Sequence, residues 1–217
     1  MPLHIVFLLA LSSLAYVNGL VVTYVQVKDN VTIPEEHEVA LVHAWFIDAF
    51  YATGSIDTPS LYKAYDGMQP NWVVLSDSNP ASTPHTKLSV ELEKYDVVST
   101  LSSRDLPFVT IKWLNLVQTI LKPIPGAGVE FEQWYAEEHT PLLSKIKGWV
   151  RGGNYHLASE KGKRRRYLGV QELSSETTIE EVAASPEFEA AMNTTWRAEI
   201  MKSWEQSIPR IFEVERV

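Results

Sequence analysis

Hydrophobic positions in the second half of the chain alternate between strand-like and helix-like spacing. A first apolar run (TIKWLNLVQTIL) is rich in β-branched and aromatic residues, and the stretch PIPGAG that follows it is typical of a turn. In the next run, large side chains from Phe131 to Leu142 recur at helical spacing. The order predicted for this half is β-α-β-β-α-β. Its elements are a strand over 110–121, a helix over 129–146, strands over 149–158 and 165–173, a helix over 179–203 that Pro186 could interrupt, and a strand over 208–217.

The first half repeats this order more loosely. Its predicted elements are a strand over 20–28, a helix over 33–51, strands over 60–66 and 72–77, a short helix over 85–95 and a strand over 96–103. Two such units predict an α+β fold in which two tandem ferredoxin-like βαββαβ units, at 20–106 and 107–217, pack sheet to sheet. Helices would cover the outer faces, and the space between the sheets could hold a cavity.

The N-terminal segment has the pattern of a signal peptide. Residues 5–17 carry no charge and are too few to span a bilayer comfortably, and Gly19 offers a cleavage point. We therefore expect residues 1–19 to be removed, which would place the protein in the secretory pathway or outside the cell, with no stable membrane span. A buried first strand or helix, or an uncleaved anchor, are the alternatives, and the first of these would fit a cytoplasmic protein. The glycosylation triplets at Asn30 and Asn193 matter only if the chain is secreted.

The amino-acid composition and net charge exclude several classes of site and partner. Hydrophobic residues make up 45% of the 217 positions, which is enough for a real core, and the absence of cysteine excludes disulfides and thiolate sites. A formal charge of −8 argues against nucleic acid as a partner. The histidines do not occur at zinc-binding spacings, and there is no glycine-rich nucleotide motif and no G-x-S-x-G. We therefore expect neither a metal nor a nucleotide cofactor.

Residues 131–151 carry a more specific pattern, FEQWYAEEHTPLLSKIKGWVR. This stretch resembles the EthD-like branch of the dimeric α/β-barrel superfamily, in which a helix with F-x-x-W-Y-x-x-E-H-x-P-L precedes a strand that begins at Gly and often carries Arg. The matching positions are Phe131, Trp134, Tyr135, Glu138, His139, Pro141, Leu142, Gly148 and Arg151. The resemblance implies that the two units form an intrachain dimeric α/β barrel of the tandem type found in fungi. The first half lacks the motif, so the resemblance places a single site in the second half.

His139 is the first candidate for chemistry. It follows Tyr135 by four residues, so both side chains should share one helix face, and histidine exchanges a proton near neutral pH. His139 could act as a general acid or base, Tyr135 could donate to a developing oxyanion, and Glu138 could orient the imidazole. The alternatives are structural: a helix-end histidine bonded to the backbone or to Glu138, and a glutamate paired with Lys145 or Arg151.

Aromatic residues supply the candidate binding surface. Trp149, Tyr155 and Tyr167 lie on the two central predicted strands, and Trp134 lies on the helix beside Tyr135. Some of these rings should line the inter-sheet cavity, where they would suit a flat apolar ligand. The alternative for each is ordinary packing between sheet and helix, and for Trp134 a place in the core.

These features, with the resemblance, lead to three hypotheses of function. The first is a cofactor-independent tailoring enzyme of secondary metabolism, a decarboxylase, cyclase or isomerase, that moves a proton on a small aromatic or polyketide-like molecule. The second is a non-catalytic protein that binds a small apolar ligand. The third is a haem or oxygen-using enzyme with His139 or His156 as an axial ligand, because the superfamily includes such members. A monomer that pairs its own halves is expected, and a homodimer is the alternative.

Overall fold

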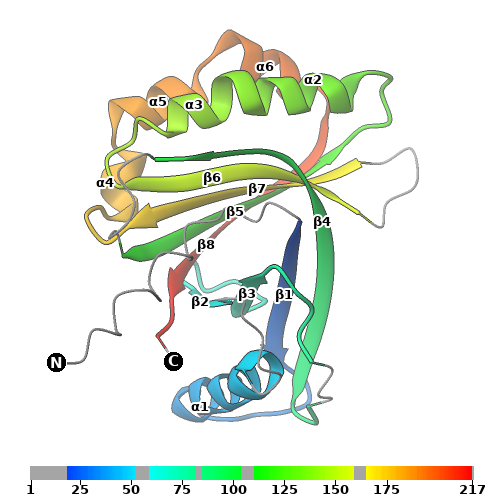
Figure 1. Ribbon diagram of the computed structural model, residues 1–217, viewed down its shortest axis with the longest axis vertical. Helices are drawn as coiled ribbons and strands as arrows, with labels where there is room; N and C mark the ends of the chain where they lie inside the picture. The colour runs from blue at the N-terminus through cyan, green and yellow to red at the C-terminus, as the bar shows by residue number, and fades with distance from the viewer. Residues whose placement is uncertain (1–18, 52–58, 82–84, 104–109, 159–164, 217) are drawn as a thin grey trace, which may run out of the picture.

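The computed structural model describes residues 19–51, 59–81, 85–103, 110–158 and 165–216. In these ranges eight strands, each antiparallel to its neighbours, close into a barrel in the order β1-β3-β2-β8-β5-β7-β6-β4 (Figure 1). The strands are β1 (Leu20–Val27), β2 (Ser60–Ala64), β3 (Trp72–Ser76), β4 (Leu88–Ser102), β5 (Ile111–Leu121), β6 (Trp149–Leu157), β7 (Arg165–Ser174) and β8 (Trp204–Val214). The sequence therefore predicted the α+β class correctly, and β1 to β3 and β5 to β7 lie where strands were expected.

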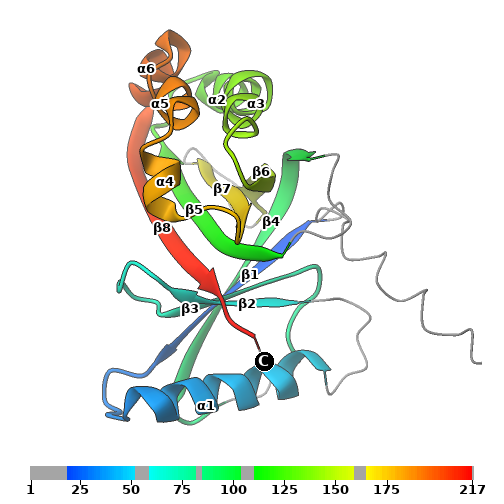
Figure 2. The same cartoon turned by 90° about the vertical axis from the view of Figure 1, so that its left-hand side faces the viewer.

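Helices cover the two outer faces of the barrel unequally. The helical segments are α1 (Glu35–Phe46), η1 (Ile47–Tyr51), α2 (Ala127–Trp134), η2 (Tyr135–His139), α3 (Thr140–Leu143), α4 (Ile179–Ala183), α5 (Pro186–Met192) and α6 (Thr195–Met201), where η marks a π-helical turn. Figure 2 shows α1 alone over the outer face of the first-half strands, and α2 to α6 in two rows on the opposite side of the molecule. The second half therefore carries most of the helical cover.

Residues 85–95 were predicted to form a helix, and this prediction was wrong. The structure has β4 there, a single strand that runs from Leu88 to Ser102. Its first residues, LSVELE, alternate apolar and polar side chains, which is the period of a strand and not of a helix, although Val90 and Leu92 are exposed in the structure. The first part of β4 pairs with β1 and the second part with β6, with a register shift after Val97. The described part of the first half therefore has the order β-α-β-β-β and lacks the second helix of the predicted unit.

The long helix predicted over 179–203 is three short helices. Each begins at a hydroxyl side chain that accepts a hydrogen bond from the backbone N–H three residues later, and these caps are Thr178, Ser185 and Thr194. Pro186 occupies the first position of α5, where its missing N–H costs nothing. The chain then enters β8 at Trp204, four residues earlier than predicted.

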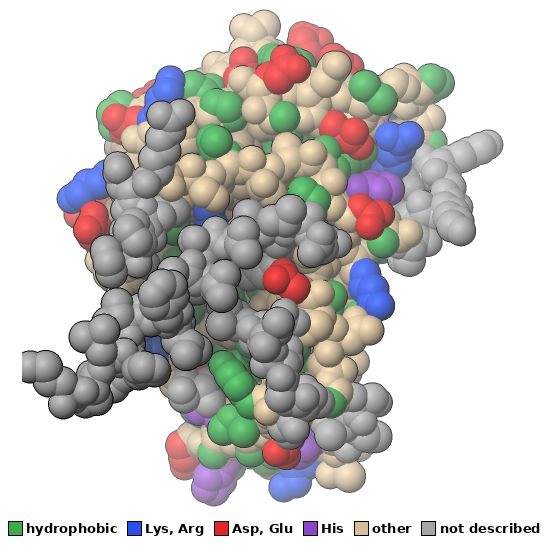
Figure 3. All heavy atoms as spheres, viewed as in Figure 1, with side chains coloured by type: hydrophobic (Ala, Val, Ile, Leu, Met, Phe, Trp, Pro, Cys, Tyr) green, Lys and Arg blue, Asp and Glu red, His purple; other side chains and the backbone are tan. Residues whose placement is uncertain are grey.

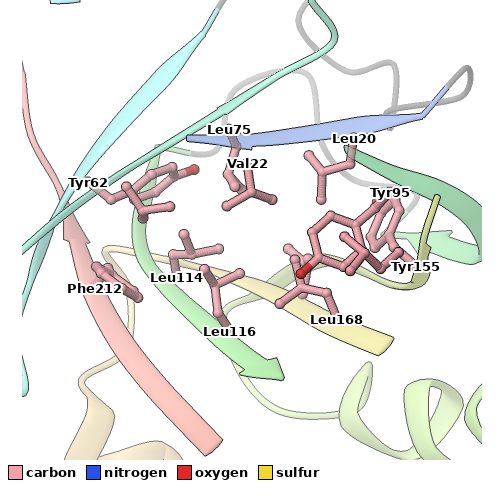
Figure 4. Packing of buried hydrophobic residues seen from close by; sticks show 13 residues of the cluster. Leu20, Val22, Tyr62, Leu75, Tyr95, Leu114, Leu116, Tyr155, Leu168 and Phe212 are labelled. Atoms are coloured by element: carbon pink, nitrogen blue, oxygen red, sulfur yellow. The ribbon is translucent and has the colours of Figure 1, made fainter. Parts of the chain in front are cut away.

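The barrel interior is a packed core. Side chains from strands of both halves point toward one another, as Figure 4 shows for ten of them. The members are Leu20, Val22, Tyr62, Val73, Leu75, Tyr95, Leu114, Leu116, Tyr155, Leu157, Leu168, Val170 and Phe212. The expected space between the two sheets is thus filled over most of its length. A cavity of about 300 Å³ lies beside Tyr24, Glu93 and Arg166.

Two predictions about the ends of the units fall outside the described residues. These are the signal peptide, of which only Gly19 is described, and the boundary at residues 106/107. Asn30 and Asn193 are both exposed, and their glycosylation stays a prediction. Among the described helices, none has the length and apolar character needed to cross a membrane.

A buried ion pair crosses from β6 to β7 inside the barrel. The guanidinium of Arg151 donates two hydrogen bonds to the carboxylate of Glu172, which also accepts from the Tyr62 hydroxyl at 2.8 Å. Glu172 is 1% exposed, so its charge depends on these donors rather than on water. Arg151, which the resemblance singled out, thus pairs with Glu172 and not with Glu138.

We expect Glu172→Gln to lower the free energy of unfolding by about 3–5 kcal/mol, because it removes the buried carboxylate charge that pairs with Arg151. The measurement is urea unfolding followed by tryptophan fluorescence. The matched control is Glu213→Gln, which removes a more exposed partner 3.5 Å from Lys112 and should cost less than about 1 kcal/mol. Equal losses of unfolding free energy in the two variants would show that the ion pair of Arg151 and Glu172 is no more important than an exposed one.

Candidate functional site

A cavity of about 280 Å³ lies between the sheet and the helices of the second half, on the outer face of β5, β7 and β8. Most of its wall is apolar. The aromatic lining residues are Phe131, Trp134, Tyr135, Trp149, Phe188 and Trp204, and the polar ones are Asn115, Thr119, His139, Gln171, Arg197 and Ser207. The site with the predicted aromatic lining is therefore not between the two sheets, as the sequence suggested, but between one sheet and its helical cover.

A π-helical turn, η2, places His139 in this cavity. It lies between α2 and α3, and Pro141 follows it at the start of α3. Proline cannot donate to the carbonyl four residues earlier, and its ring crowds that carbonyl, so the wider turn just before Pro141 relieves the clash. Through this turn the imidazole of His139 stacks on Trp134 with 4.4 Å between ring centroids and meets the edge of Tyr135 at 5.0 Å. The sequence correctly predicted that His139 and Tyr135 share a helix face.

His139 is neutral in this setting. Burial, and then the positive charge of Arg197, lower its pKa from 6.5 to about 3, while an interaction with the backbone of Ala191 acts in the opposite direction. The Nδ1 atom is buried and has no hydrogen-bond partner among the described residues. A neutral imidazole with an unpartnered ring nitrogen can exchange a proton with a bound molecule.

A short relay of hydrogen bonds orients Tyr135. The indole N–H of Trp149 donates to Oε1 of Gln171 at 2.7 Å, and Nε2 of Gln171 donates to the Tyr135 hydroxyl at 3.4 Å. The hydroxyl oxygen thus accepts from Gln171 and keeps its own proton for donation. Burial raises the pKa of Tyr135 to about 12, so the group stays protonated.

Two glycines make room for this relay. A Cβ atom at Gly169 would lie 2.1 Å from the Tyr135 hydroxyl oxygen, and one at Gly152 would lie 2.2 Å from Oε1 of Gln171. The side chains of Tyr135 and Gln171 therefore lie directly on the backbone of β7 and β6. Substitution of either glycine by a larger residue would displace them.

The remaining predicted site residues lie elsewhere. Glu138 accepts from the Trp134 indole at 3.1 Å and from the Thr194 hydroxyl at 2.5 Å, and so joins the helix to the cap of α6 instead of contacting His139. Tyr167 packs against Phe131 and donates to Glu132 at 2.6 Å, beside the cavity rather than in its wall.

Tyr155 points into the barrel core, on the opposite face of the sheet from the cavity. Strict alternation along β6 would place Trp149 and Tyr155 on one face. An extra residue between Trp149 and Arg151, seen as a register shift against β7, puts them on opposite faces instead. Of these two candidate binding residues, Trp149 therefore lines the cavity and Tyr155 does not.

The lining residues that were not predicted from the sequence include Asn115, Gln171, Arg197 and Trp204. The signal for the first two was present, because Asn115 and Gln171 are amides on the helix-facing side of otherwise apolar strands. Nothing in the periodicity marked Arg197. In the described ranges, no three His, Cys, Asp or Glu residues gather in a way that could hold a metal ion.

No family model matches the chain, and no curated protein matches it. Solved structures do match. The match to an anthrone oxidase-like protein covers 92% of this chain and 92% of that protein, with a TM-score of 0.57 and 11% sequence identity. A putative monooxygenase from Fusobacterium nucleatum matches 93% of this chain and 94% of its own, with a TM-score of 0.53 and 8% identity. The match to a major regulator of staphylococcal pathogenesis covers 91% of this chain and 99% of that protein, with a TM-score of 0.56 and 9% sequence identity.

The chain has the ferredoxin-like α/β-barrel fold. The coarse part of the resemblance read from residues 131–151 is thereby confirmed, while membership of the EthD-like branch and the fungal tandem type stay predictions. At these identities the likeness concerns fold alone.

The glycine under Tyr135 gives a first test of this geometry. We expect Gly169→Ala to lower the free energy of unfolding by about 1–3 kcal/mol, because the new methyl group overlaps the Tyr135 hydroxyl. Tyr135→Phe removes that oxygen and should recover much of the loss in the double variant. Chemical unfolding of the four proteins measures the coupling, and purely additive effects would contradict the contact.

Burial of His139 also predicts a pH dependence of stability. Its pKa is about 3 in the folded protein and near 6.5 when unfolded, so the unfolded chain binds the extra proton between these values. Stability is then complete above pH 6.5 and falls with decreasing pH by up to about 1.4 kcal/mol per pH unit. Urea unfolding at pH 7, 6 and 5 should show this slope in wild type and a shallower one in His139→Gln. Parallel slopes would show that His139 titrates normally.

Proposed function

We propose that the protein is an enzyme without a resident cofactor that moves a proton on a small aromatic or polyketide-like molecule held between the sheet and the helices. The observation that carries this proposal is the position of His139. Its imidazole is neutral, buried at 8% exposure in an aromatic-lined cavity, and its Nδ1 atom is unpartnered. Buried polar atoms are normally hydrogen-bonded, so an exception that lines a cavity indicates a missing partner.

The arrangement supports proton abstraction beside a carbonyl group. His139 would take a proton from carbon or from a hydroxyl group, and the protonated Tyr135 would donate a hydrogen bond to the enolate oxygen that develops. Return of the same proton to another atom completes an isomerisation or an intramolecular ring closure. In a decarboxylation, the proton would instead be delivered to the carbon that loses carbon dioxide. In each case the substrate supplies both the proton donor and the acceptor site.

The size of the cavity agrees with such a substrate. A cavity of about 150 Å³ holds one benzene molecule, so about 280 Å³ suits two or three fused rings. An anthrone oxidase-like protein of the same fold offers an analogy for ligands of this kind. A haem, with its four pyrrole rings, does not fit this volume, and His156 lies next to Tyr167 outside the cavity wall.

The test uses a strain of the source organism from which the gene is deleted. We expect wild type and His156→Gln to restore the small-molecule profile, because His156 is a histidine of the same sheet that does not line the cavity. His139→Gln should fold normally, fail to restore the product and cause a precursor to accumulate. Mass spectrometry of the extracts measures both compounds, and the mass difference between them gives the reaction.

Restoration of the profile by His139→Gln would contradict the enzymatic proposal. It would favour the alternative, a non-catalytic protein that binds an apolar ligand in the same cavity. The likeness to a regulator of the same fold shows that this architecture is not confined to proteins named as enzymes.

A further inference from the structure

Arg197 is the one positively charged residue in the cavity wall, and it has no counter-charge among the described residues. Nη1 donates to the backbone carbonyl of Met192 at 2.9 Å, and Cζ lies 5.7 Å from the ring centroid of Trp204. A guanidinium group has five N–H donors, so most remain available. Burial lowers the pKa of Arg197, and no carboxylate offsets this effect.

The other partly buried arginines that the structure describes differ in this respect. Arg151 pairs with Glu172, Arg166 pairs with Glu93 at 2.5 Å, and Arg210 pairs with Asp66 at 2.8 Å. Withdrawal of a charge from water is unfavourable unless an opposite charge or hydrogen bonds replace the water. A negatively charged ligand could therefore supply the opposite charge that Arg197 lacks.

Three more unpartnered polar atoms line the same cavity. They are the indole N–H of Trp204, Oδ1 of Asn115 and Nδ1 of His139, each buried and without a hydrogen-bond partner in the described ranges. Trp204 can only donate, the Asn115 oxygen can only accept, and the His139 nitrogen accepts when the imidazole proton is on Nε2. The cavity thus offers donors at Arg197 and Trp204, and acceptors at Asn115 and His139.

We propose that the ligand of this cavity is an aromatic carboxylic acid that also carries a hydroxyl group. Arg197 and Trp204 bind its carboxylate, its rings lie among the aromatic side chains, and its hydroxyl group donates to His139 or Asn115. This inference rests on the proposed function only in that it uses the same cavity. It adds the charge of the ligand, which an apolar aromatic pocket alone does not specify.

A bound carboxylate would also act on His139. Because the positive charge of Arg197 disfavours protonation of the imidazole, a negative charge beside Arg197 weakens this effect and makes His139 a stronger base. The substrate would then prepare its own base on binding. An uncharged analogue would lack this action even if it filled the same space.

The test compares 3-hydroxy-2-naphthoic acid with its methyl ester by isothermal titration of the full chain. We expect the acid to bind at least about tenfold more tightly, since the ester loses a charge-assisted hydrogen bond. Decanoic acid is a second probe, which separates recognition of an aromatic acid from recognition of any carboxylate. It should bind more weakly than the naphthoic acid.

Arg197→Gln should weaken binding of the acid about tenfold and leave the ester unchanged, whereas Arg197→Lys should retain part of the preference. The matched control is Arg165→Gln, a more exposed arginine that does not line the cavity, and it should bind both compounds like wild type. Unfolding midpoints of all variants, measured in parallel, show whether each one is folded.

An acid that binds no better than its ester, including the case in which neither binds, overturns the inference. The inference is also overturned if Arg197→Gln weakens binding of the acid and of the ester equally. These results are distinct from failure of the proposed function. A preference for the acid that depends on Arg197, together with restoration of the metabolite profile by His139→Gln, would support a binding protein for aromatic acids and exclude the enzyme.

Discussion

Two strands that each pair with both halves of the chain hold the molecule together. β4 hydrogen-bonds to β1 and then to β6, and β8 hydrogen-bonds to β2 on one side and to β5 on the other. These pairings leave the barrel without a free edge, and they direct alternate side chains into a shared interior. Because the interior is packed with apolar residues of both halves, a ligand site of useful size has to form at an end of the barrel or on an outer face.

The outer face of β5 to β8 meets this requirement because the helices above it are short and separate. Between Thr178 and Met201 the chain changes direction at each capped helix start, so Phe188, Met192 and Arg197 can form a rim around the cavity. A single long helix would instead have packed one continuous apolar stripe on the sheet. The described side chains on the face in Figure 3 mix acidic, basic and apolar groups over the helices of the second half.

The sequence predicted the strands of the second half well, because alternation and turn residues are local signals. It failed at 85–95, where the length of β4 depends on pairing with two distant strands. The resemblance over residues 131–151 pointed to His139 and Tyr135, and helical spacing correctly placed both on one helix face. The side of the sheet that Tyr155 faces was not predicted, because an extra residue in β6 reverses the alternation. Arg197 could not be recognised, since an arginine on a helix has no local mark that distinguishes an unpaired charge from a paired one.

The unequal helical cover has a consequence for how this protein can evolve. In a barrel assembled from two identical chains, every substitution appears on both outer faces at once, so a change that improves a pocket on one face also alters the opposite face. Here the outer face that α1 covers and the outer face that α2 to α6 cover are encoded by separate residues. Selection can therefore reshape the pocket around His139 while the first half is constrained mainly to keep the barrel closed.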